Sequence, residues 1–112
     1  MDDQEILAIA IIRPFEGREE ELLAVLREFY VVLARKGYSR DQLFREDVFS
    51  PRYFNFRYWK SAIARSQAYE DSDIHQFWQR ISEICEVEKV YEQLHEVKFA
   101  GNQNLVATDL HG

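Results

Sequence analysis

The hydrophobic pattern of the chain begins with a run in which neighbouring residues are all apolar. Residues 6–12, Ile-Leu-Ala-Ile-Ala-Ile-Ile, are apolar at both odd and even positions. Side chains alternate between the two faces of a strand, so this pattern predicts a strand that is buried on both faces. Pro14 and Gly17 then interrupt the pattern.

A helical spacing of apolar residues follows at about residues 17–36. The apolar positions lie three and four residues apart: Leu22, Leu23, Val25, Leu26, Phe29, Tyr30 and Leu33. Three glutamates open this segment, and Arg35 and Lys36 close it ahead of Gly37. This arrangement matches the helix dipole and the preference for glycine after a helix, so we expect a helix here.

Two segments with interleaved apolar residues predict a hairpin. Its arms are residues 42–49 and 53–59, and Ser50-Pro51-Arg52 is the expected turn. Because side chains alternate along a strand, the second arm has two distinct faces. One face carries Tyr53, Asn55, Arg57 and Trp59, and the other carries Phe54, Phe56 and Tyr58.

The remaining pattern predicts two helices and a last strand. Ser61 is a suitable N-cap for a short helix that runs to Ala68, and the acidic residues 70–73 can cap the next helix. The apolar positions of that second helix are Ile74, Phe77, Trp78, Ile81, Ile84 and Cys85. We expect it to end near Glu88 and to be followed by a strand at residues 89–99.

This order of elements, βαββαβ with the second helix split in two, is typical of the α+β class with a ferredoxin-like fold and a four-stranded antiparallel sheet. The helices cover one face of the sheet, so the apolar second face needs another cover, most simply a second copy of the chain. We therefore expect a homodimer joined through its sheet faces. Residues 1–112 form one domain, with a core at about 5–98 and a tail at 99–112 that packs on its own subunit or on the partner.

Composition restricts the possible functions. The 112 residues carry a net charge of -6, which argues against binding to nucleic acid or to an anionic membrane. No apolar run is long enough to cross a bilayer, and no signal-peptide pattern is present, so we expect a cytoplasmic protein. The single cysteine and three scattered histidines do not have the spacing of a metal site. Aromatic residues make up 14%, which favours a dimer interface or an apolar pocket over a merely crowded core.

Several local patterns resemble the antibiotic biosynthesis monooxygenase (ABM) family. The resemblance covers about residues 5–98. It rests on the Pro-and-Gly turn before an acidic helix, the aromatic strand that ends in Trp59, the Ser61 cap, and the Ser-Asp-Ile-His start of the last helix. It implies a dimeric α+β barrel with a pocket between sheet and helices in each subunit. Similar proteins include cofactor-independent oxygenases of phenolic or quinol substrates and haem-degrading enzymes.

The resemblance implies catalytic roles for Asn55, Trp59 and His75. An amide can hold a substrate carbonyl or a reduced oxygen species, and an indole N–H adds a second donor beside an apolar wall. An imidazole can act as a base. The alternatives are that Trp59 fills the core, that Asn55 bonds a neighbouring backbone group, and that His75 bonds locally or faces solvent.

Five further residues are candidates for substrate binding: Arg57, Tyr69, Phe77, Trp78 and Arg80. The two arginines can bind an anionic substrate or intermediate. If Arg57 is instead structural, it needs a carboxylate partner, for which Glu46 and Glu92 on adjacent strands are the candidates. The three aromatic residues are expected to form a pocket wall, with core packing as the alternative.

We therefore expect a monooxygenase that uses no cofactor and no metal and acts on a small aromatic or quinol-type substrate. A dihydroxyaromatic substrate can itself be deprotonated and give an electron to oxygen. Haem degradation is not expected. That branch carries an Asn on the first strand, where this chain has only Ile, Leu and Ala. It also carries a Trp followed ten residues later by a His, and this chain has Tyr69 and Gln79 at these two positions. The alternatives are a non-catalytic dimer that binds a small ligand or serves in a stress response, and a structural role in which the rings fill the pocket.

Overall fold

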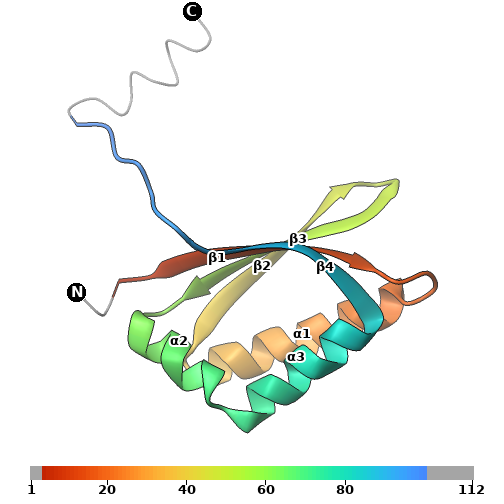
Figure 1. Ribbon diagram of the computed structural model, residues 1–112, viewed down its shortest axis with the longest axis horizontal. Helices are drawn as coiled ribbons and strands as arrows, with labels where there is room; N and C mark the ends of the chain where they lie inside the picture. Colours follow the sequence, from red (N-terminus) through yellow and green to blue (C-terminus); the bar gives the residue numbers. More distant parts are fainter. Residues whose placement is uncertain (1–3, 101–112) are drawn as a thin grey trace, which may run out of the picture.

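The computed structural model describes residues 4–100, which form a sheet with helices packed on one of its faces (Figure 1). The elements are β1 (Ile6–Pro14), α1 (Glu19–Arg35), β2 (Ser39–Asp47), β3 (Ser50–Trp59), α2 (Ala62–Tyr69), α3 (Ser72–Ile84) and β4 (Cys85–Leu94). The strand order is β2-β3-β1-β4, and every pairing is antiparallel. This is the ferredoxin-like α+β arrangement that the sequence predicts.

The core lies between the helices and the sheet. The sheet contributes Ile6 and Ile12 from β1 and Tyr53 and Trp59 from β3, all less than a tenth exposed. The largest side chains that are fully buried come from α1 and α3: Leu22, Phe29, Leu33 and Ile74. Each such side chain stabilises the fold by about 1.5–3 kcal/mol relative to its exposed state.

The predicted caps at the starts of α2 and α3 are present, and α1 is slightly shorter than the expected 17–36. The Ser61 hydroxyl accepts a hydrogen bond from the backbone N–H of Ala64 at 3.0 Å, and the Asp71 carboxylate accepts one from Asp73 at 2.9 Å. Gly37 follows α1 with a φ of 76°, a conformation that side chains disfavour.

The predicted hairpin turn at Ser50-Pro51-Arg52 is wrong. Asp47 pairs with Ser50, and the Asp47 side chain accepts hydrogen bonds from the backbone N–H groups of Phe49 at 2.7 Å and Ser50 at 2.9 Å. An aspartate that bonds backbone groups two and three residues ahead closes a tight turn by itself, so the chain reverses before Pro51. The first arm consequently begins at Ser39, and its register places Asp41 opposite Arg57.

The predicted end of the last helix near Glu88 is also wrong. The helix α3 ends at Ile84, and Cys85, expected to be helical, is extended and pairs with Pro14 at the start of β4. The carbonyl of Ile84 accepts a hydrogen bond from the backbone of Phe15 at 3.0 Å. Strand pairing with β1 therefore determines the structure from Cys85 onwards, although the spacing of apolar residues there is helical. The strand ends at Leu94, and the expected tail lies almost entirely outside the described residues.

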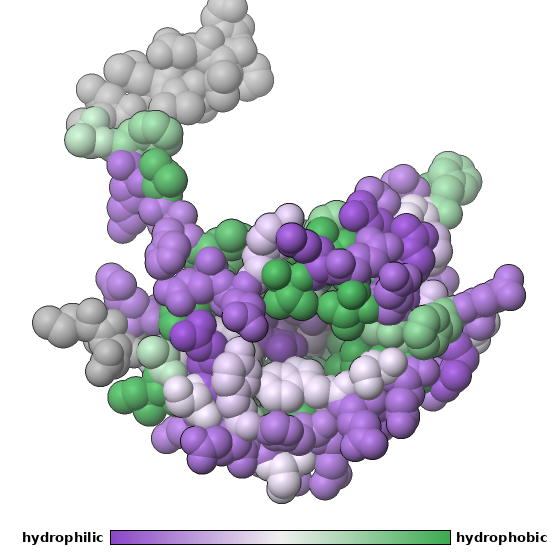
Figure 2. All heavy atoms as spheres, in the orientation of Figure 1, coloured by the Kyte–Doolittle hydropathy of each residue, from purple (hydrophilic) through white to green (hydrophobic). Residues whose placement is uncertain are grey.

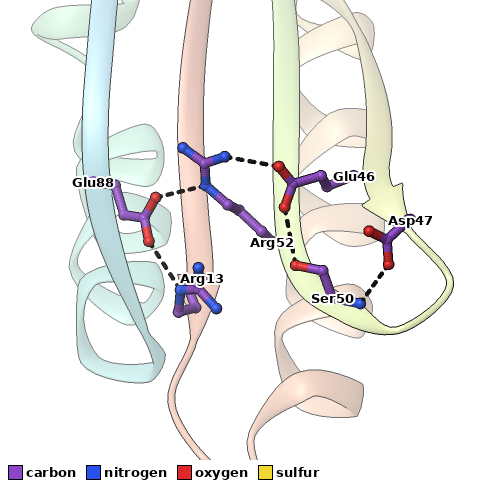
Figure 3. Close-up of polar contacts among 6 residues, drawn as sticks. All are labelled: Arg13, Glu46, Asp47, Ser50, Arg52 and Glu88. Carbon is purple, nitrogen blue, oxygen red and sulfur yellow. Dashed lines mark hydrogen bonds and ion pairs between the residues drawn. The ribbon is translucent and has the colours of Figure 1, made fainter.

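The second face of the sheet carries aromatic rings and an ion-pair network, and no helix of residues 4–100 lies over it (Figure 1). Phe44 packs edge-on against Phe56 with ring centroids 5.2 Å apart, and Phe44 is 49% exposed. The network links all four strands through Arg13, Glu88, Arg52 and Glu46, at 2.9, 2.8 and 2.9 Å (Figure 3). This face therefore has an apolar centre and a charged border that no helix of the described residues covers.

Asp71 joins the end of α1 to the start of α3. Its carboxylate accepts hydrogen bonds from the Lys36 ammonium at 2.9 Å and from the Tyr38 hydroxyl at 2.7 Å. These two donors lower the pKa of Asp71 to about 2, below its ordinary value of about 3.9. The charged form is therefore favoured in the folded state.

We expect Asp71→Ala to lower the free energy of unfolding by about 1 kcal/mol at pH 7, because the helix loses its N-cap. Asp71→Asn keeps a cap acceptor and removes only the charge. Because the folded-state pKa is depressed, the charge contributes fully above about pH 4, and its contribution disappears as the pH falls towards 2. Urea denaturation of wild type and Asp71→Asn between pH 7 and pH 2 measures this convergence; a difference that persists unchanged at pH 2 would contradict it.

Candidate functional site

A cavity of about 390 Å³ lies between the sheet and the helices, where Figure 2 shows a hollow in the surface. Its walls are mainly apolar, with Phe29 from α1, Trp78 from α3 and Val90 from β4 among the lining residues. On β1, two small residues, Ala8 and Ala10, face it in place of larger side chains. The volume is within the range of small-molecule sites, about 300–1,000 Å³.

Asn55 of β3 lies at the cavity wall and is only 6% exposed. Its amide oxygen accepts a hydrogen bond from the Tyr30 hydroxyl at 2.7 Å, and its amide nitrogen donates to Asp41 at 3.0 Å. Asn55 thus bonds two side chains, not the neighbouring backbone group considered from the sequence. Burial raises the pKa of Tyr30, so its hydroxyl stays protonated and donates.

Arg57 lies two residues further along the same face of β3 and forms an ion pair with Asp41. The Nε of Arg57 is 2.7 Å from the Asp41 carboxylate, and the exposed fractions of the two side chains are 14% and 0%. The sequence-based candidates for this partner, Glu46 and Glu92, are both wrong. Glu46 shares the face of Phe54 and Phe56, opposite to that of Arg57, and it pairs there with Arg52.

Trp59 is both a core residue and part of the cavity wall. It is 2% exposed, the Arg57 guanidinium lies 5.3 Å from its ring, and Tyr69 packs edge-on against it at 5.9 Å. Within residues 4–100 its indole N–H has no hydrogen-bond partner. Every fully buried polar side-chain atom in these residues does have a partner, so the indole nitrogen is not fully buried. Trp59 is also one of the residues that line the cavity.

The structure brings five of the eight predicted site residues to this cavity: Asn55, Arg57, Trp59, Tyr69 and Trp78. The rings of Tyr69 and Trp78 lie 5.5 Å apart, as a shared wall of α2 and α3. Tyr69 and Trp78 thus line the cavity, while Phe77 is a core residue.

His75, Phe77 and Arg80 do not line the cavity. His75 is exposed, its Nε2 bonds the backbone carbonyl of Tyr69, and its ring lies edge-on to Trp78 at 5.5 Å. Phe77 stacks on Phe29 at 4.9 Å, behind the cavity wall. The Arg80 guanidinium lies over the Phe77 ring at 5.6 Å, on the exposed side of α3.

Two residues of the site, Tyr30 and Asp41, were not identified from the sequence. A signal for Asp41 exists, since in a hairpin whose turn is centred on residues 48–49 it faces Arg57 across the pair of strands. Tyr30 shows only as one more apolar position of α1, although a buried tyrosine hydroxyl generally needs a hydrogen-bond partner.

Three observations concern other chemistry in the described part of the chain. Across residues 4–100, no three His, Cys, Asp or Glu side chains gather so that they could hold a metal ion. Burial raises the pKa of Cys85 to about 11, so its thiol is protonated at neutral pH. None of the helices described is long and apolar enough to cross a membrane.

The chain has the fold of a group of known structures. SnoaB, a cofactor-independent oxygenase from Streptomyces nogalater, is 18% identical with a TM-score of 0.69, covering 84% of this chain and 97% of that protein. A protein from Bordetella bronchiseptica that is proposed to be an antibiotic biosynthesis monooxygenase is 20% identical with a TM-score of 0.66, covering 84% of this chain and 99% of that one. No family model matches the sequence. No curated protein matches it either.

We expect Tyr30→Phe to lower the free energy of unfolding by roughly 1–2 kcal/mol, because the amide oxygen of buried Asn55 loses its donor. Tyr58→Phe is a matched control, since the Tyr58 hydroxyl on the opposite sheet face has no hydrogen bond within residues 4–100. Urea denaturation of both variants measures the difference. Equal stability losses in the two would contradict the bond to Asn55.

Proposed function

We propose that this chain, which has the fold of the antibiotic biosynthesis monooxygenases, is a cofactor-independent monooxygenase of a small quinol-type aromatic. The observation that carries this proposal is the cavity, where Asn55 and Trp59 present polar groups on one strand face inside an apolar, aromatic wall. SnoaB, whose fold it shares, is itself a cofactor-independent oxygenase.

The substrate ring lies against the apolar wall, and its oxygen meets the donors of Asn55 and Trp59. The substrate binds in its neutral form and loses a proton to water in the cavity. The resulting anion gives one electron to O₂, and the two radicals combine to form a carbon–oxygen bond. The peroxide anion takes up a proton from water, and the hydroperoxide then loses H₂O. For a substrate CH₂ group, the balance is CH₂ plus O₂ giving a carbonyl and H₂O. The donors stabilise the negative charge that develops on the substrate oxygen and on the reduced O₂.

The other predicted site residues have supporting roles in this proposal. Arg57, Tyr69 and Trp78 line the cavity and bind the substrate. His75 holds two parts of the wall in place, because it bonds the Tyr69 carbonyl and packs on Trp78. Phe77 and Arg80 stabilise the wall from behind through Phe29.

The test of this function is oxygen consumption by the metal-stripped protein with a panel of hydroquinones and anthrone-like phenols, followed with an oxygen electrode. We expect consumption above the uncatalysed rate, and a loss of roughly 100-fold in kcat/KM in Asn55→Ala, the size expected when one hydrogen-bond donor to a developing charge is removed. Trp59→Phe also removes a donor. We expect this variant to lose most of its turnover while its melting temperature changes little.

A cavity-filling variant separates the site from general stability. Ala10→Leu leaves every polar group of the site in place and narrows the cavity beside Asn55, so we expect turnover to fall about tenfold or more with little change in melting temperature. Ala24→Leu makes the same change on the exposed side of α1 and is the matched control. Full activity in Ala10→Leu would place the reaction elsewhere.

A non-catalytic small-ligand-binding or stress-response module is the second candidate function. One observation favours it: His75, the base that the family resemblance implies, lies outside the cavity wall. The ligand-binding function is supported if ligands shift the melting temperature and no member of the substrate panel is turned over.

The working unit in this proposal is a homodimer that joins the sheet faces opposite the helices. This face carries Phe44, Phe54 and Phe56. It also carries the network of Arg13, Arg52, Glu46 and Glu88, which Figure 3 shows. An apolar centre with a charged border is typical of protein interfaces. A second copy brings the same surface, so that the two aromatic centres bury each other around a two-fold axis.

We expect Phe56→Glu to shift the protein to monomers, because two buried charges would face each other across the two-fold axis. Ile63→Glu, at a position of α2 that is 55% exposed, adds the same charge outside this face and is expected to leave the dimer intact. Sedimentation velocity at matched concentrations distinguishes the two. A wild-type monomer, or dissociation of both variants alike, would refute this interface.

A further inference from the structure

The Asp41 carboxylate lies at the centre of the polar cluster beside the cavity, and the proposed reaction does not use it directly. Its side chain is fully buried and accepts hydrogen bonds from Ser39 at 2.8 Å, Asn55 at 3.0 Å and Arg57 at 2.7 Å. A buried carboxylate is strongly destabilising unless its charge is compensated and its lone pairs are bonded. Asp41 meets both conditions, and it thereby holds two side chains that line the cavity.

Asp41 determines which way the Asn55 amide points. A carboxylate can only accept hydrogen bonds, so the amide turns its nitrogen to Asp41 and its oxygen to the Tyr30 hydroxyl. The second proton of the amide nitrogen has no protein acceptor among residues 4–100. Asn55 therefore offers the cavity a hydrogen-bond donor, while its oxygen is already engaged.

Arg57 and Trp59 add donors to the same cavity. The Nε of Arg57 is bound to Asp41, and within the described residues its two terminal nitrogens have no acceptor. The guanidinium is held over the rings of Phe29 at 4.9 Å and Trp59 at 5.3 Å. With the Trp59 indole N–H, the polar groups of the inner wall are hydrogen-bond donors.

The charge of this donor set is nevertheless cancelled. The positive charge of Arg57 is paired at 2.7 Å with the negative charge of Asp41. The other charged residue that lines the cavity is Glu92, which is exposed on β4 and negative. An anionic ligand would find donors but no net positive charge, and it would meet the Glu92 carboxylate. A ketone or quinone oxygen accepts the same hydrogen bonds without this repulsion.

We propose that Asp41 is a positioning residue that aims Asn55 and Arg57 into the cavity as donors and cancels the Arg57 charge, so that the cavity selects neutral carbonyl ligands over carboxylates. This inference rests on the proposed function in that it takes the same cavity as the ligand site. It decides between the two roles that the sequence leaves open for Arg57, since the arginine is paired and still bonds a ligand.

The test uses three probes with one naphthalene framework: 1-acetonaphthone, a neutral ketone; 1-naphthoate, its carboxylate counterpart; and 1-ethylnaphthalene, which has no acceptor. Affinities come from ¹H–¹⁵N spectra of the full chain, in which the two tryptophans give two indole signals. We expect the wild type to bind the ketone at least about tenfold more tightly than either other probe, with the Trp59 indole proton shifting as it donates.

Asp41→Asn keeps the shape of the side chain and leaves the Arg57 charge unpaired. We expect the ketone-to-naphthoate affinity ratio to fall at least about tenfold, because the carboxylate now meets a free cation. The matched control is Glu46→Gln, which removes one negative charge and one arginine partner from the same strand on the opposite face. It is expected to keep the wild-type ratio.

If Asp41→Asn does not fold, two other measurements test the same idea. Arg57→Gln removes the cation while Asp41 still holds Asn55. We expect this variant to bind naphthoate more weakly than the wild type does. In the wild type, one Asn55 amide proton is expected to exchange slowly with solvent, since it is bound to Asp41, and the other is expected to shift when the ketone binds.

Two results would overturn the inference: a wild type that binds naphthoate as tightly as the ketone or binds none of the probes, and an Asp41→Asn variant that weakens all three probes in proportion. The second result is what a merely structural role for Asp41 predicts. Selective ketone binding without any oxygen consumption would instead overturn the proposed monooxygenase and leave this inference standing. The two failures are therefore distinguishable.

Discussion

Two polar side chains of β3, Asn55 and Arg57, point towards the helices, where a sheet covered on that face normally carries apolar residues. Burial of an amide and a guanidinium is tolerated only if their hydrogen bonds and charge are satisfied within the protein. The fully buried carboxylate of Asp41, on the neighbouring strand, accepts a hydrogen bond from the Nε of Arg57 at 2.7 Å and balances its charge. It also accepts a hydrogen bond from the amide nitrogen of Asn55 at 3.0 Å. The orientation of Asn55 and Arg57 at the cavity depends on this carboxylate.

The register of the β2–β3 hairpin in turn depends on the turn at Val48 and Phe49. Had the chain reversed at Ser50-Pro51-Arg52, the strand pairing would have shifted, and Asp41 would not lie opposite Arg57. The Asp47 side chain fixes the turn through two backbone hydrogen bonds, and these lie at the end of the hairpin far from the cavity along the strand. A local interaction in a loop therefore decides which residue neutralises the site.

The cavity exists because large and small residues are distributed unevenly over the helix-facing side of the sheet. Ile6 and Ile12 at the ends of β1 pack into the core, while Ala8 and Ala10 between them leave space opposite the aromatic side chains of α1 and α3. The rings that are too many for the core of a small domain are placed at this cavity and on the opposite face of the sheet. Each face thus has an apolar surface available for a partner of its own: a small molecule on one side and, in our proposal, a second copy on the other.

The elements that depend on local interactions could be predicted from the order of amino acids alone. The apolar run of β1, the spacing along α1, and the caps at Ser61 and Asp71 act within a few residues, and so does the alternation that puts Asn55, Arg57 and Trp59 on one face. The features that depend on pairing between distant segments could be known only from the folded chain. Cys85 left the helical pattern because β1 offered it backbone partners, Asp41 met Arg57 because of the hairpin register, and His75 came to lie outside the cavity because of the way α3 packs. Side-chain patterns record the environment of a residue, but they do not record which distant residue supplies that environment.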